Sequence, residues 1–148
     1  MNLSNLKLGA VSGLAGGIVF GMLMGMMGML PMIGMMVGSS SAAGGFLVHI
    51  GISVVIGAGF GVLLGATAHR PKAALAAGMA YGFAWWLLGP LTLMPLFMGM
   101  GLGVSWSAQA MVGAMPSLMG HLLFGAVVGF TYNRLLQGSR SGVAVHAG

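Results

Sequence analysis

Four long apolar runs, separated by short polar segments, organise the hydrophobic pattern of this chain. The runs cover about residues 8–30, 45–66, 73–93 and 117–136. Each is close to the roughly 20 apolar residues that cross a bilayer as an α-helix. The pattern therefore predicts an all-α membrane protein with four transmembrane helices, built as a single transmembrane domain over residues 1–148. The polar residues 137–148 are predicted to form a mobile tail.

Small residues recur at intervals of four within three of these runs. The stripes are Gly9, Gly13, Gly17, Gly21, Gly25; then Gly45, His49, Ser53, Gly57, Gly61, Gly65; and Ser117, His121, Gly125, Gly129, Asn133. Residues four apart share one face of a helix, and in a bilayer faces of Gly and Ser let two backbones approach closely. The stripes therefore predict helix-packing faces. We expect the second and fourth helices to meet face to face at the centre of the bundle.

The two halves of the chain also resemble each other. An offset of 72 matches His49 with His121 and Phe60 with Tyr132, and an offset of 64 matches Pro31 with Pro95. Both halves enter the membrane from the same side. This similarity predicts two parallel, pseudo-repeated helical hairpins related by a twofold axis along the membrane normal.

The composition excludes a soluble protein. Of the 148 residues, 58% are hydrophobic and 3% are charged, there is no Asp or Glu, and the mean hydropathy is +1.04. A soluble domain carries about a quarter charged residues. The predicted partner is thus the lipid bilayer. The absence of cysteine excludes disulfides and thiolate metal sites.

The five cations predict the orientation. They are Lys7, Arg70, Lys72, Arg134 and Arg140. All fall at the N-terminus, in the middle loop or at the C-terminus, so the positive-inside rule places both termini in the cytoplasm. The expected location is the inner (plasma) membrane. Because the cations are scattered singly rather than gathered in a patch, nucleic-acid binding is not expected.

Two histidines are the first candidate site. His49 and His121 each lie near the outer end of a predicted packing face. An ionisable group inside a membrane is costly and usually has a function, so the pair is a candidate for binding haem or a metal ion. The alternative is structural: a neutral imidazole that bonds a backbone carbonyl or Ser53 would hold two helices together. A role in a pore or in binding another ligand is the third possibility.

Methionines give a weaker candidate. Met22 and Met26, and Met32 and Met36, have four-residue spacing, and thioethers favour monovalent copper. The cofactors considered are therefore haem b and copper. Methionine is also a flexible filler beside glycine, so ordinary packing is the competing interpretation.

The residues do not favour enzymatic chemistry. The chain has no carboxylate or thiol, and no serine or lysine has a base nearby in the sequence. The expected function is therefore non-catalytic, acting by helix packing as a homo-oligomer or as a small subunit of a membrane complex. The alternatives are a haem or metal protein ligated by His49 and His121, and a small pore or carrier for a neutral solute.

Short motifs carry a resemblance. They are Trp85-Trp86-Leu87-Leu88-Gly89-Pro90, Leu93-Met94-Pro95-Leu96, Met115-Pro116-Ser117-Leu118-Met119-Gly120-His121-Leu122 and Gly44-Gly45-Phe46-Leu47-Val48-His49. Over about residues 9–135 the chain resembles a family of small, uncharacterised bacterial inner-membrane proteins with four spans and one His in each half. The resemblance implies the fold and the location. It supplies no catalytic or binding residues.

Overall fold

The structure, a computed structural model, describes residues 3–146 as helices, turns and loops, and the side chains of residues 3–139. Four helical segments are long and apolar enough to cross a membrane: Leu3–Met26, Ala42–Leu64, Pro71–Phe97 and Met115–Ser139. The elements in chain order are α1 (Leu3–Met26), α2 (Leu30–Gly34), η1 (Met35–Val37), α3 (Ala42–Leu64), α4 (Pro71–Leu88), η2 (Gly89–Leu93), α5 (Met94–Phe97), η3 (Val104–Trp106), α6 (Ala108–Gly113) and α7 (Met115–His146). The prediction of an all-helical chain with four spans is confirmed at this level.

The first span ends earlier than Pro31. Gly28 has a left-handed φ of +68°, the Met29 amide donates to the Met24 carbonyl at 2.9 Å, and the Gly28 amide donates to the Gly25 carbonyl at 3.1 Å. This pair of bonds with a left-handed glycine is the Schellman helix stop. Pro31 instead lies in the first turn of α2, where its missing N–H has no helical partner to lose.

The third span does not stop at its prolines. Residues 89–93 form the π-helix η2, and α5 then continues the span to Phe97. Thr92 Oγ1 donates to the Leu87 carbonyl at 2.7 Å, which adds a side-chain bond to the backbone of this turn. Short π-helical turns of this kind occur often at functional sites.

The last helix is longer than predicted. Residues 137–146, part of the predicted polar tail, continue α7 to His146. This stretch contains no proline, the residue that most strongly stops a helix already nucleated upstream. Residues 147 and 148 lie outside the described residues.

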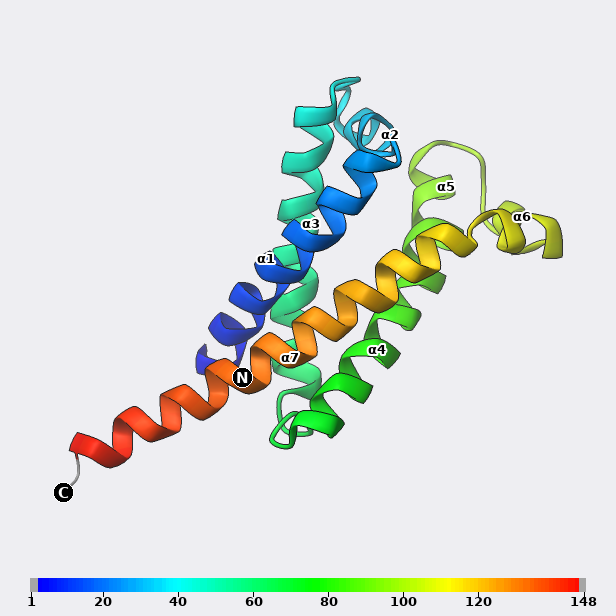
Figure 1. The fold of residues 1–148 in the computed structure, drawn as a ribbon. Helices are drawn as coiled ribbons and strands as arrows, with labels where there is room; N and C mark the ends of the chain where they lie inside the picture. Colours follow the sequence, from blue (N-terminus) through cyan, green and yellow to red (C-terminus); the bar gives the residue numbers. More distant parts are fainter. Residues whose placement is uncertain (1–2, 147–148) are drawn as a thin grey trace.

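The four spans form two hairpins that diverge at one end. α1 packs along α3, α4 packs along α7, and the hairpins meet mainly where α1 crosses α7. In Figure 1 the hairpins separate toward the end that carries α2, α5 and α6. The second and fourth spans, α3 and α7, make few contacts, so the expectation that they press together is wrong.

The glycine stripes lie inside the hairpins. In the first hairpin, a Cβ on Gly9 or Gly13 would strike the backbone of α3, and a Cβ on Gly57 or Gly61 would strike that of α1. The four-residue spacing identifies the packing face, but it does not say which helix that face meets. The glycine face of α3 therefore packs against the glycine face of α1.

The second hairpin is built in the same way, from the predicted glycines of α7 and from two glycines of α4 that the sequence reasoning missed. A Cβ on Gly78 or Gly82 of α4 would meet the α7 backbone, and a Cβ on Gly125 or Gly129 would meet that of α4. Gly78 and Gly82 have the same interval of four, but only two glycines carry it. A repeat of two glycines is a weaker indication of a packing face than the repeat of five glycines in the first span.

Four glycines of the predicted packing set contact side chains instead of a neighbouring backbone. Gly17 faces Ser53, and Gly21 faces Phe46 and His49. Gly65 faces the hydroxyl of Tyr132. Gly25 is exposed and would meet only the end of the Leu30 side chain, because α1 has passed beyond its close contact with α3 at this point.

Candidate functional site

A cavity of about 820 Å³ lies between the two hairpins, at the end where they diverge. Its walls come from the parts of α1, α3, α4 and α7 at this end, from α2 and η1, and from η2, α5 and α6. The lining is apolar except for a few groups, among them His49, Ser53, Ser117 and His121. The two histidines singled out from the sequence therefore share one cavity, although α3 and α7 hardly touch.

His49 projects from α3 and is 8% exposed. Its Nε2 lies 3.1 Å from the Gly17 carbonyl oxygen of α1 and 3.5 Å from Ser53 Oγ. Because a carbonyl oxygen only accepts, Nε2 must donate, and the neutral ring then keeps its lone pair on Nδ1. The bond crosses from one helix to another and holds α3 on α1.

His121 projects from α7 and bonds differently. Its Nδ1 lies 2.8 Å from the Ser117 carbonyl oxygen, one turn earlier in the same helix, and 3.3 Å from Ser117 Oγ. By the same argument Nδ1 donates and Nε2 keeps the lone pair. A Cβ on Gly89 would lie 3.8 Å from this Nε2, so the free nitrogen faces the start of η2. This bond does not join two helices.

Phe20 of α1 contacts both imidazoles. Its ring meets His49 edge-on at a centroid distance of 5.3 Å and His121 at 4.9 Å. Gly120 makes this possible, because a Cβ there would fall on the Phe20 ring. The sequence reasoning missed both residues. Their only signals are the place of Phe20 within the glycine-rich first span and the position of Gly120 next to His121.

The methionines of the predicted copper motif divide between two surfaces. Met32 and Met36 line the cavity, whereas Met22 and Met26 are not among its lining residues and are 63% and 86% exposed. The first span is a continuous helix up to Met26, so Met22 and Met26 follow its outer face. The methionines that line the cavity are Met24, Met27, Met29, Met32, Met36, Met94, Met98 and Met100.

The described residues contain no group of three or more His, Cys, Asp or Glu placed to hold a metal ion. Two imidazole nitrogens are the nitrogen ligands that the cavity offers, and thioether sulfurs are the other candidate ligands. The set is soft and uncharged. It suits ions that thioethers and imidazoles prefer over carboxylates.

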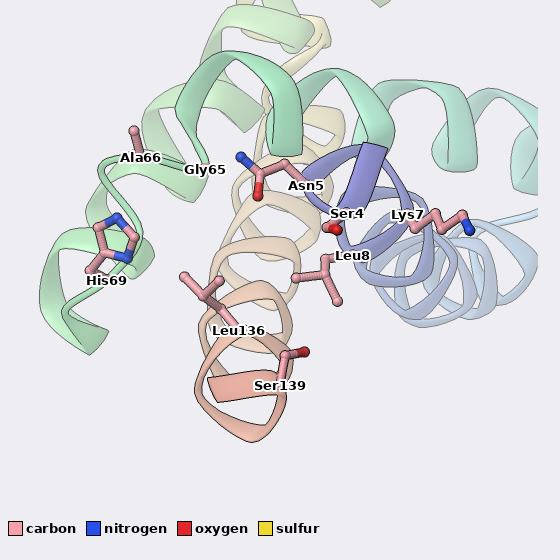
Figure 2. A pocket seen from close by; sticks show the side chains of 9 residues that line it. All are labelled: Ser4, Asn5, Lys7, Leu8, Gly65, Ala66, His69, Leu136 and Ser139. Carbon is pink, nitrogen blue, oxygen red and sulfur yellow. The ribbon is translucent and has the colours of Figure 1, made fainter. Parts of the chain in front are cut away.

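A second pocket lies at the opposite end of the molecule. It has a volume of about 560 Å³ and is lined from α1, from the turn after α3 and from α7 (Figure 2). Ser4, Asn5, Lys7 and His69 give it a polar character. His69 thus belongs to a different site from His49 and His121.

No protein-family profile, no curated protein and no solved structure matches the chain. The resemblance to four-span bacterial membrane proteins therefore stays a prediction.

Proposed function

We propose that the chain is a non-catalytic, multi-pass membrane protein that binds a metal centre between its two hairpins, with His49 and His121 as ligands. One observation carries the proposal: each imidazole donates one N–H to a backbone carbonyl, which leaves the lone pair on its other nitrogen, and both histidines line one cavity. Metal-binding histidines are oriented in this way, since the second nitrogen is fixed by a carbonyl or carboxylate. The carbonyls of Gly17 and Ser117 take the place of the carboxylates that the chain lacks.

The hydrogen bonds separate this proposal from a purely structural role. His49 connects α3 to α1, so packing alone accounts for it. His121 is half-buried and its hydrogen bond stays within its own helix, although its ring contacts Phe20 of α1. An ionisable group in the membrane whose hydrogen bond joins no second helix is the more informative of the two.

A pore finds little support in the arrangement. Toward the other end of the bundle, the side chains of Phe60, Val128 and Tyr132 are fully buried. The Phe60 ring meets Tyr81 at 5.5 Å and Tyr132 at 5.6 Å, which fills the space between the hairpins. The cavity therefore has a packed floor.

A packing role in a homo-oligomer or a larger membrane complex is the second candidate, and exposed helical glycines favour it. Gly25 of α1 and Gly51 of α3 are exposed, and a Cβ on Gly51 would meet nothing within 4 Å. Glycine destabilises a helix by about 1 kcal/mol relative to alanine, so close approach of another helix would explain it there. Native mass spectrometry of the wild type and of Gly51→Leu tests this candidate. It requires an oligomer that the substitution dissociates.

The proposal includes the pseudo-repeat and the orientation. Phe60 and Tyr132, matched by the offset of 72, lie in ring contact, and His49 and His121 both contact Phe20, as positions near a twofold axis would. The cations Lys7, Arg70, Lys72 and Arg134 lie toward one end, which supports termini in the cytoplasm of a plasma-membrane protein. The cavity then opens toward the outer face.

Metal analysis of the purified protein tests the proposal. We expect a stoichiometric metal ion, or a haem absorbance band, in the wild type and in His69→Ala, and its loss in His121→Ala. His69 is the matched control because it lies in the other pocket. A wild type free of metal and haem after isolation from metal-replete membranes, and after incubation with each candidate, contradicts the proposal.

A further inference from the structure

The cavity is rich in thioether sulfur on both sides. Five of its methionines come from the first hairpin, between Met24 and Met36, and three come from the second, between Met94 and Met100. Methionine is uncharged, so it offers soft coordination without a carboxylate or a thiolate. Thioethers on both walls would surround any ion on its way from the cavity opening to the imidazoles.

The charge balance restricts the ion. The chain has no Asp or Glu, and its formal charge is +5. The cost of placing an ion in a medium of low dielectric rises with the square of its charge, so a divalent cation pays about four times the penalty of a monovalent one. Neutral ligands supply no negative charge to offset that penalty. The site therefore favours a monovalent ion that gains from sulfur and nitrogen coordination.

The same balance disfavours haem. A haem b carries two propionates, which need cationic or other donor partners. No lysine or arginine lines the cavity among the residues whose side chains are described, and Lys7, Arg70, Lys72 and Arg134 lie toward the other end. The Phe20 ring, which contacts both imidazoles, also occupies space beside them.

Met24 is the cavity methionine nearest in sequence to Phe20, whose ring contacts both imidazoles. It follows Phe20 by one helical turn on the same face of α1 and is 4% exposed. Both residues line the cavity. Met22, two residues away, is 63% exposed on another face. One helix thus carries a methionine aimed into the cavity and a methionine aimed away from it.

We propose that the bound group is a single monovalent soft cation, copper(I) in its chemistry, held in the cavity by His49 Nδ1, His121 Nε2 and the Met24 sulfur. The inference rests on the proposed metal-binding function and names its ion class. The remaining methionines of the cavity provide exchangeable thioethers between this site and the opening. No electron is transferred, because the ion enters and stays in its reduced state.

Equilibrium titration of the full-length protein in detergent with silver(I), a redox-stable substitute for copper(I), tests the inference. We expect one tight site in the wild type and no comparable binding of zinc(II). Met24→Leu should weaken silver binding roughly tenfold or more, as loss of a supporting or direct ligand does at metal sites. Met22→Leu, a matched change on the same helix, should bind like the wild type.

The outcomes distinguish the two proposals. Tight zinc(II) or haem binding that His121→Ala abolishes overturns the copper(I) inference and leaves the metal-binding function standing. Equal silver binding by Met24→Leu, Met22→Leu and the wild type also overturns the inference. A wild type that binds no metal or haem overturns both. Circular dichroism of each variant checks the fold, and methionine to leucine nearly preserves side-chain volume.

Discussion

At the scale of single residues, the two histidines have different tasks although they occupy matched positions. His49 bonds the Gly17 carbonyl across a helix interface, whereas His121 bonds the Ser117 carbonyl within α7. The sequence predicted both as one pair, and the structure does place both in one cavity. It could not predict the difference, because hydrogen-bond partners depend on which helix lies opposite, and that is set by tertiary packing.

This difference predicts unequal stability effects. His49→Ala removes a bond between helices and should lower the free energy of unfolding by about 1 kcal/mol. His121→Ala removes a bond within one turn, so its loss should cost clearly less. Unfolding of metal-free protein in mixed micelles, followed by circular dichroism, measures both. A larger loss in His121→Ala than in His49→Ala would contradict the assignment.

At the scale of elements, the small residues determine which helices approach each other. Four apolar spans and their approximate limits could be predicted, because length, hydropathy and residue spacing are local properties. Which helix packs against which could not be predicted. A Gly face can pack against any other Gly face. Gly9 and Gly13 pack against α3 within the first hairpin, so they are not available for contact with a neighbouring chain. The π-helix that begins at Gly89 could not be predicted from the sequence either, because Pro90 predicts an interruption of the helix but not which kind.

Glycine substitutions in α3 should therefore have opposite signs. Gly57→Ala places a Cβ against the backbone of α1 and should destabilise by about 1–3 kcal/mol, as overpacking does. Gly51→Ala meets open space on the same helix and should be neutral or stabilising by up to about 1 kcal/mol. Urea unfolding in detergent compares the two variants. Equal effects would argue against close packing of α1 on α3.

At the scale of the whole molecule, two hairpins meet at one end and part at the other. The aromatic contacts among Phe60, Tyr81 and Tyr132 close the bundle below the cavity. The cations lie toward the closed end, and in the orientation proposed above the open end faces away from the cytoplasm. The positions of the cations in the sequence predicted that they would lie at one end of the bundle. They could not predict the cavity, which exists only because α3 and α7 do not pack together.

The orientation predicts which loops an impermeant reagent reaches. The chain contains no cysteine, so an introduced cysteine is the only thiol in it that a maleimide can label. Ser40→Cys, in the loop before α3 at the open end, should react with an impermeant maleimide on intact cells. Thr67→Cys, in the turn after α3, should react only after the membrane is permeabilised. The reverse pattern would show that the cavity opens toward the cytoplasm.

The central claim is that the two imidazoles and the thioethers of the cavity bind one soft ion between the hairpins. X-ray absorption at the silver or copper edge of the loaded protein observes the ligand atoms themselves. The account predicts a first shell of both nitrogen and sulfur, with nitrogen reduced in His121→Ala and sulfur reduced in Met24→Leu. A shell of oxygen alone, or one that is the same in both variants and the wild type, would contradict it.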